Sequence, residues 1–150
     1  MRLALATDHA GFQLKKFAAR MLAQDGHEVV DYGAYLYDPE DDYPDFIRLA
    51  ARDVAEDPDS RKAIIFGGSG QGEAMVANRC PGVRATVYYG GNQDIIVLSR
   101  EHNNANVLSL GARFLTKEGA LVVIRTWLAT SFSHDPRHER RIGKIDFIRA

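Results

Sequence analysis

Short apolar runs alternate with amphipathic segments along the whole chain. The apolar runs have the length of buried strands and predict strands at residues 2–7, 28–31, 62–67, 83–88 and 106–110. The segments between and after them repeat apolar side chains at helical spacing and predict helices at residues 11–24, 43–56, 71–79, 91–101, 116–129 and 136–149. We therefore expect an α/β protein with a three-layer, Rossmann-like fold, in which helices cover both faces of a five-stranded parallel sheet.

Composition narrows the class of protein. The chain has 150 residues and is 45% hydrophobic, which is enough for one domain with its own core, so we expect residues 1–150 to form a single domain ending in the helix 136–149. The 19 basic and 20 acidic side chains nearly cancel, and no overall field would draw the protein to nucleic acid or an anionic membrane. Because there is no leader-like segment and no apolar run of about 18 residues, we expect a cytoplasmic protein without a membrane partner.

The clearest candidate for chemistry is the loop after the third apolar run. It consists of Gly67, Gly68, Ser69, Gly70, Gln71 and Gly72, and it leads into a helical pattern whose first turn carries Glu73. Glycine lets backbone N–H groups approach a ligand closely, and a helix N-terminus adds unpaired donors and partial positive charge. Such a loop suits an anion, either a phosphate or an oxyanion that develops during a reaction. A tight turn without a ligand is the alternative.

A second candidate follows the first strand, where Asp8 and His9 stand side by side. In doubly wound sheets a ligand binds beyond the carboxyl ends of the strands, where the strand order reverses. The usual orders place the first and third strands together at that point, so Asp8 and His9 would face the glycine loop. An Asp–His pair beside an anion site suits proton transfer. Asp8 is equally well explained as a cap of the first helix.

Several ordered motifs carry a resemblance to a known family. They are Asp8-His9-Ala10-Gly11, Asp42-Tyr43-Pro44, the loop from Gly67 to Glu73, Ala77-Asn78-Arg79, the segment from Ser99 to Asn106, and Arg137-His138-Glu139-Arg140-Arg141. Together they resemble type B ribose-5-phosphate isomerases, whose relatives act on galactose 6-phosphate and allose 6-phosphate. The resemblance implies interconversion of ribose 5-phosphate and ribulose 5-phosphate through a cis-enediolate, with no metal and no other cofactor.

The resemblance implies that Glu73 is the catalytic base. One branch of the family uses a cysteine at the position of Gly67, whereas the other uses a glutamate that matches Glu73. The single Cys80 lies about two helical turns beyond Glu73 and cannot replace that thiol, so we interpret it as a structural residue. Taken without the resemblance, Glu73 is equally well explained by its favourable interaction with the helix dipole. The dipole should lower its pKa and burial should raise it, and the sequence leaves the balance open.

Further roles follow from the same resemblance. The Ser69 hydroxyl and the backbone N–H groups of residues 68–72 would hold the enediolate oxygen, and Asp8 would orient sugar hydroxyls or move protons between them. The expected substrate-binding residues are His9, Tyr43, Gly67, Gly68, Gly70, Gln71, Gly72, Asn103, Arg113, Arg137 and Arg141. The three arginines match phosphate ligands of the family, and guanidinium groups suit a dianionic phosphate. Packing against Pro44 is the alternative for Tyr43, and a solvated basic helix face is the alternative for Arg137 and Arg141.

His102 and Asn103 indicate an assembly. They end the predicted helix 91–101, which is about 16 Å long, and therefore lie at the amino end of the sheet, far from the glycine loop of the same chain. The resemblance implies that His102 opens the sugar ring, so this pair would serve a neighbouring subunit. We expect a homodimer or a dimer of dimers with active sites shared between subunits. A helix C-cap formed by Asn103 and Asn104 is the alternative.

Other functions remain to be separated from this one. The same chemistry could act on allose 6-phosphate, galactose 6-phosphate or a tetrose phosphate. A non-catalytic phosphate- or flavin-binding module would also use a glycine loop here, but it would not need Glu73, Asp8 and His102 together. A signalling receiver domain needs an aspartate after the third strand, where this chain has Gly67-Gly68. A dinucleotide-binding fingerprint fits poorly because the glycines follow the third strand rather than the first.

Overall fold

The computed structural model describes residues 1–148, which form five strands and six α-helices. The strands are β1 (Arg2–Thr7), β2 (Glu28–Asp31), β3 (Lys62–Gly67), β4 (Ala85–Tyr88) and β5 (Val107–Gly111). The helices are α1 (Phe12–Gln24), α2 (Tyr43–Glu56), α3 (Gln71–Ala77), α4 (Asp94–Glu101), α5 (Lys117–Ala129) and α6 (Pro136–Asp146), and a 3-10 turn, η1 (His9–Gly11), precedes α1. Every predicted strand and helix is present.

The differences from the predicted elements lie at their ends. Helix α4 begins at Asp94 rather than at residue 91, because Gly90 and Gly91 have φ angles of 117° and 92°, which no right-handed helix accepts. Strand β4 begins at Ala85 rather than at residue 83. Helix α6 ends at Asp146, with Phe147 as its C-cap, and residue 149 of the predicted helix lies outside the described residues.

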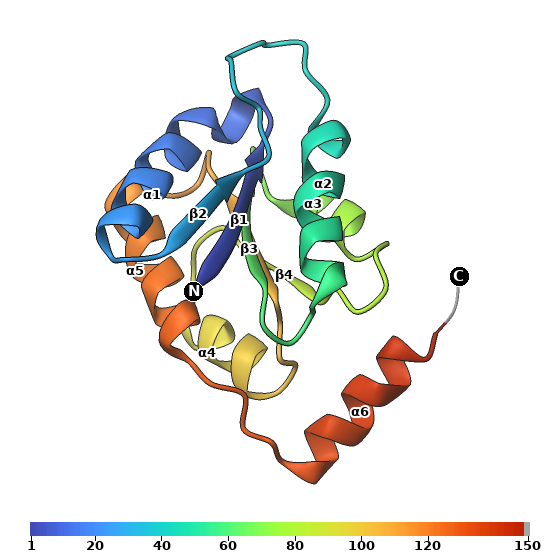
Figure 1. The fold of residues 1–150 in the computed structure, drawn as a ribbon. Helices are drawn as coiled ribbons and strands as arrows, with labels where there is room; N and C mark the ends of the chain where they lie inside the picture. Colours follow the sequence, from blue (N-terminus) through green and yellow to red (C-terminus); the bar gives the residue numbers. More distant parts are fainter. Residues whose placement is uncertain (149–150) are drawn as a thin grey trace.

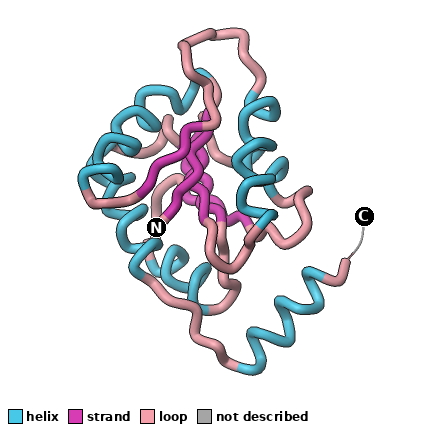
Figure 2. Tube along the Cα trace, viewed as in Figure 1, coloured by secondary structure: helices cyan, strands magenta, loops and turns pink. Residues whose placement is uncertain are grey.

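The five strands form one parallel sheet in the order β2-β1-β3-β5-β4. Figure 1 shows α1, α4 and α5 on one face of this sheet and α2 and α3 on the other, and Figure 2 shows the strands between these helical layers. The predicted three-layer α/β fold is therefore confirmed. Within residues 1–148, no helix combines the length and the apolar character needed to cross a membrane.

Two apolar cores lie on opposite faces of the sheet. Successive residues of β1 alternate between them: Leu3 and Leu5 join the core under α1, α4 and α5, whereas Ala4 and Ala6 join the core under α2 and α3. Both sets are fully buried, which explains why the strands read as continuous apolar runs. Trp127 of α5 fills the first core and is also completely buried.

The neighbouring position of β1 and β3 decides where the candidate site forms. Their residues pair in register up to Thr7 and Phe66, so both strands end at the same edge of the sheet. The pairing of β3 with β5 ends there too, at Gly67 and Gly111. The loops after β1, β3 and β5 therefore emerge together, as the strand order of doubly wound folds leads us to expect.

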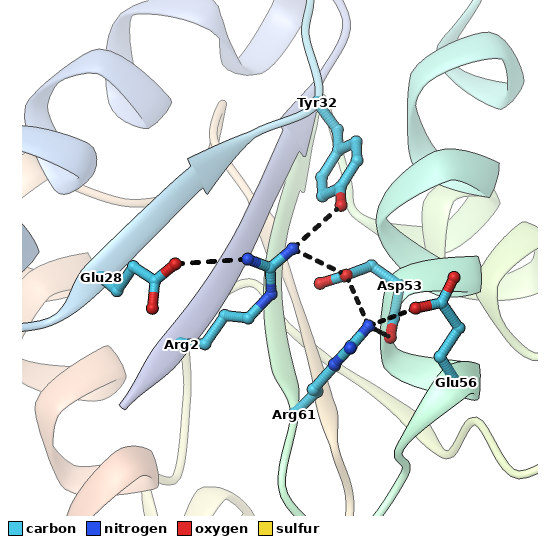
Figure 3. A network of polar contacts seen from close by, with 6 residues as sticks. All are labelled: Arg2, Glu28, Tyr32, Asp53, Glu56 and Arg61. Carbon is cyan, nitrogen blue, oxygen red and sulfur yellow. Dashed lines mark hydrogen bonds and ion pairs between the residues drawn. The ribbon is translucent and has the colours of Figure 1, made fainter.

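A polar network ties the opposite end of the molecule together (Figure 3). It comprises Arg2, Glu28, Tyr32, Asp53, Glu56 and Arg61. At its centre, Asp53 Oδ1 accepts a hydrogen bond of 2.9 Å from Arg2 and another of 2.9 Å from Arg61. The Asp53 side chain is only 5% exposed, and its hydrogen bond to Arg2 is the main reason that the pKa of Arg2 is raised. Asp53 thus joins α2 to β1 and to the segment before β3.

We expect Asp53→Ala to lower the thermal unfolding midpoint by about 5 °C or more, because it leaves two guanidinium groups without their shared buried acceptor. Glu28→Gln is the matched control, since Glu28 pairs with the same Arg2 but its side chain is 69% exposed. Circular dichroism melts of both variants would measure the difference. Equal small shifts would show that the network adds little to stability.

Candidate active site

A cavity of about 490 Å³ opens at the carboxyl ends of the strands. It is lined by Asp8, His9, Ala10, Tyr43, Gly68, Ser69, Gly72, Glu73, Arg113 and Phe114. These residues come from the loops after β1, β3 and β5 and from the first turns of α2 and α3. The volume suits a small phosphorylated metabolite, and the lining combines a carboxylate, a histidine, an arginine and a glycine loop.

The glycine loop between β3 and α3 is shaped by the neighbouring strand. Gly70 has a φ angle of 78°, and its carbonyl oxygen accepts a hydrogen bond of 2.6 Å from the buried Ser109 hydroxyl of β5. Gly68, Ser69 and Gly70 donate no backbone hydrogen bond to any group of residues 1–148. The Ser69 oxygen lies 3.3 Å from the Gln71 N–H, at the start of α3. The loop therefore presents free donors next to a helix N-terminus, as an anion site requires.

Glu73 lies on the first turn of α3 and is only 4% exposed. Burial raises the pKa of its carboxyl group above the ordinary value, and the nearby charge of Asp8 acts in the same direction, while a hydrogen bond from its own backbone N–H opposes them. Burial thus outweighs the opposing backbone hydrogen bond, and the pKa is raised. A carboxylate with a raised pKa is better suited to accept a proton near neutral pH.

Gly67 leaves the space that the Glu73 carboxylate occupies. A Cβ atom at residue 67 would overlap both carboxylate oxygens of Glu73. A side chain at position 67 and a glutamate at position 73 in this rotamer therefore exclude each other. Glycine at residue 67 is therefore what allows the Glu73 carboxylate to take this position.

Asp8 and His9 leave β1 on the η1 turn and face the glycine loop across the cavity. Asp8 caps this turn by accepting a hydrogen bond of 3.0 Å from the Ala10 N–H, as the capping interpretation expects. It is also buried and lines the cavity, and its role in proton transfer stays a prediction. The Nδ1 atom of His9 lies 2.7 Å from Asp41 Oδ1. This hydrogen bond and the charges of Asp8 and Asp41 raise the pKa of His9, against burial and the charge of Arg113.

Asp8, His9 and Asp41 bring oxygen and nitrogen atoms within 4.8 Å of one another. Such spacing is compatible with a cation, but the facing atoms of His9 and Asp41 are already joined by a hydrogen bond of 2.7 Å. We therefore interpret the three side chains as a hydrogen-bonded and charged group, not as metal ligands.

Tyr43 and Arg113 complete the wall of the cavity. A Cβ at Gly72 would lie 2.6 Å from the Tyr43 hydroxyl, and one at Gly68 would lie 3.2 Å from the Arg113 guanidinium. Each glycine thus lets a polar group lie directly over the loop. Gln71, by contrast, is exposed and does not line the cavity, and Gly67 and Gly70 lie buried behind it.

The remaining predicted site residues lie outside this cavity. His102 is the C-cap of α4, and its ring packs against that of the buried His138 of α6, with centroids 4.2 Å apart and the ring planes tilted by 41°. Asn103 lines a different cavity, of about 380 Å³, together with Ile145. Arg137 and Arg141 are exposed on α6, which projects from the body of the molecule in Figure 1. The structure thus brings together one group of predicted residues and separates a second group from it.

Sequence reasoning missed Phe114 and the contact that Asp41 makes with His9. Phe114 lines the cavity beside Arg113 and packs edge-on against Tyr89, with centroids 5.9 Å apart. Asp41 contacts His9 across 32 positions of sequence, from the loop before α2. Neither residue belongs to a sequence motif that indicates a functional site, so only the folded structure shows that they contribute to this one.

The fold and the cavity define an α/β protein with a polar site at the carboxyl ends of its strands, and comparison with known proteins identifies the family. A family model described as Ribose/Galactose Isomerase matches residues 3–145, and the chain belongs to this family. It is 44% identical to ribose-5-phosphate isomerase B of Mycolicibacterium paratuberculosis over 142 residues, which covers 95% of this chain and 87% of that protein.

Solved structures agree with this assignment. Ribose-5-phosphate isomerase B of Mycoplasma genitalium, solved with bound ribulose-5-phosphate, has a TM-score of 0.92 and is 37% identical, covering 97% of this chain and 93% of that one. The ribose 5-phosphate isomerase of Thermotoga maritima has a TM-score of 0.89 and is 38% identical, covering 98% of each chain.

We expect Gly67→Ala to lower turnover of a sugar phosphate by at least tenfold, because the new methyl group displaces the Glu73 carboxylate. Gly143→Ala is the matched control, since a Cβ there meets nothing within 4 Å. Steady-state kinetics of both purified variants would measure the effect. Full activity of Gly67→Ala in a protein of normal stability would contradict the importance of this rotamer.

Proposed function

We propose that the protein interconverts ribose 5-phosphate and ribulose 5-phosphate through a cis-enediolate, with Glu73 as the base. The observation that carries the proposal is a buried carboxylate with a raised pKa beside a loop of free backbone donors in one cavity. The names of the relatives, which include a structure with bound ribulose-5-phosphate, support the choice of substrate.

The proton transfer uses the groups that meet in the cavity. Glu73 removes the proton from C2 of the open-chain aldose as the electron pair moves to the carbonyl oxygen, and the resulting enediolate receives the proton at C1. The backbone N–H groups of residues 68–72 and the Ser69 hydroxyl stabilise the enediolate oxygen, and such stabilisation is usually the largest single contribution to catalysis in sites of this kind. Asp8 orients the sugar hydroxyls and moves protons between their oxygens.

The substrate phosphate lies at the other end of the cavity in this proposal. His9 and Arg113 bind it from within the same chain, and Tyr43 binds the sugar between them. A histidine with a raised pKa and a guanidinium group supply the positive charge that a dianion needs. No step requires a metal or another cofactor.

We further propose that each active site is completed by a neighbouring subunit, in a homodimer or a dimer of dimers. The partner would supply His102 to open the sugar ring, with Asn103, Arg137 and Arg141 as further ligands. The support is geometric, since these groups lie apart from the cavity of their own chain, and α6 carries apolar residues such as Ile145 that are 49% exposed. A cytoplasmic location fits this function.

The choice of sugar is the finer question. Loop residues 34–41 lie between β2 and α2, and Tyr37 of this loop packs against His9 with ring centroids 6.5 Å apart. Allose 6-phosphate, galactose 6-phosphate and a tetrose phosphate are the alternatives. A screen of these phosphates that compares kcat/KM tests the proposal directly, and binding without turnover of any of them would favour a non-catalytic phosphate- or flavin-binding module.

We expect Glu73→Gln to lower turnover at least a hundredfold while substrate binding stays largely intact, because an amide cannot accept the carbon-bound proton. Cys80→Ser is the control, since burial raises the pKa of the Cys80 thiol and this residue does not line the cavity. Single-turnover kinetics and equilibrium binding would separate the two effects. Near-normal turnover of Glu73→Gln would remove Glu73 as the base.

A mixing experiment tests the shared site. A mixed dimer of Glu73→Gln and His102→Ala would contain one doubly damaged site and one wild-type site, so each mixed dimer should recover up to about half of wild-type activity. Subunit exchange has to be verified by native mass spectrometry. If every chain built its own complete site, exchange would restore nothing. An open-chain substrate should rescue His102→Ala but not Glu73→Gln.

A further inference from the structure

Asp41 makes two hydrogen bonds to one residue. Its Oδ1 atom accepts from the His9 backbone N–H at 2.9 Å and from the His9 ring at Nδ1, 2.7 Å away. The Asp41 side chain is 9% exposed and that of His9 is 25% exposed, so water competes little for these contacts. Asp41 therefore clamps both the backbone and the ring of His9.

The contact fixes where the imidazole carries its proton. An ionised carboxylate only accepts hydrogen bonds, so the His9 Nδ1 atom must be a donor. This leaves Nε2 as the free nitrogen of a ring that lines the cavity. In the cationic ring Nε2 is a donor and suits a phosphate oxygen, whereas in the neutral ring it would be a lone pair that repels one. A hydrogen bond from Nε2 to a phosphate oxygen therefore requires the cation.

Other charges around His9 also affect the protonation of its ring. Asp8 Oδ2 lies 3.9 Å from Nδ1 and favours the cation, and Arg113 disfavours it. The Tyr37 ring covers one edge of the imidazole. The second carboxylate oxygen of Asp41, Oδ2, is buried and has no hydrogen-bond partner within residues 1–148. Among the groups described, His9 is thus the direct partner of the Asp41 charge.

We propose that Asp41 is a positioning residue that holds His9 as a phosphate-binding imidazolium, with Nδ1 bound to Asp41 and Nε2 presented to the phosphate of the substrate. This proposal rests on the proposed function for the identity of the substrate. It adds a residue that acts through His9 and contacts neither the sugar nor the phosphate. It also explains why the loop before α2, which carries Asp41, is tied to the turn after β1.

The kinetic test compares Asp41→Asn with Glu40→Gln. The first variant keeps the shape of the side chain and removes its charge, and the second removes the same charge from the exposed neighbour. Asp41→Asn should raise KM for ribose 5-phosphate about tenfold at about pH 8 and leave kcat within about twofold, because a charge-assisted contact to the phosphate is lost. Glu40→Gln should change neither.

The pH dependence has a definite sign. The Asp41 carboxylate raises the pKa of His9, so the wild-type imidazolium persists to higher pH than it would without this partner. In Asp41→Asn the cation is lost at lower pH, and the rise of KM with pH should begin earlier. Near pH 6 both proteins should bind substrate with similar KM. An Asp41→Asn effect of equal size at all pH values would indicate a purely structural role and overturn the proposal.

A double-mutant cycle measures the coupling between Asp41 and His9. In a His9→Asn background, Asp41→Asn should change KM by less than about twofold, because the residue on which Asp41 acts is gone. An unchanged tenfold effect in that background would also overturn the proposal.

Nuclear magnetic resonance separates this proposal from the proposed function. In ¹⁵N spectra the His9 ring, assigned by its absence in His9→Asn, should show a protonated Nδ1 in the wild type and a lower titration midpoint in Asp41→Asn. Inorganic phosphate should perturb the His9 signal less in Asp41→Asn than in the wild type. If no sugar phosphate is isomerised but these spectra behave as expected, the proposed function fails and the role of Asp41 stands. If isomerase activity is present but the His9 spectra do not respond to Asp41→Asn, the role of Asp41 fails and the function stands.

Discussion

The parallel pairing of β3 with both β1 and β5 is the constraint on which the candidate site depends. Because the three strands end at one edge, Asp8, the glycine loop and Arg113 converge although they are far apart in sequence. The pairing continues past the strands, since the N–H groups of Ala112 and Arg113 donate to the carbonyl oxygens of Gly67 and Gly68 at 2.8 and 3.2 Å. This extension brings the Arg113 guanidinium over the loop and gives the cavity its positive charge.

At this edge of the sheet, packing determines the pKa of the Glu73 carboxyl group. Glu73 lies against Gly67, in space that any side chain at residue 67 would take, and its burial is what raises its pKa. A buried carboxylate without a charged partner is unfavourable for stability unless it serves a function. The proposed role as a base is such a function, and a functional site commonly departs from what stability alone would select.

The predicted site residues that lie outside the cavity, at the end of α4 and on α6, are held by contacts of their own. The buried Arg100 donates a hydrogen bond of 2.9 Å to the Asn104 side chain, contacts the carbonyl oxygens of Ala105 and Thr130, and lies 5.5 Å from the centre of the Trp127 ring. It thereby fixes the turn that carries His102, while Arg84 pairs with Asp146 at 3.2 Å and anchors the end of α6. The two groups are each ordered by the chain but kept apart, which is the geometry that a site shared between subunits would need.

The sequence by itself determined the elements and their type, because apolar periodicity and glycine positions report local backbone preference and burial. It also placed Asp8, His9 and the glycine loop at one edge, since doubly wound sheets put the first and third strands together. Only the tertiary structure decided the full strand order and the contact of Asp41 with His9, because these depend on which distant segments pack together. It also decided that the pKa of Glu73 is raised by burial, since the pKa of a carboxyl group is set by its complete surroundings and not by its neighbours in sequence.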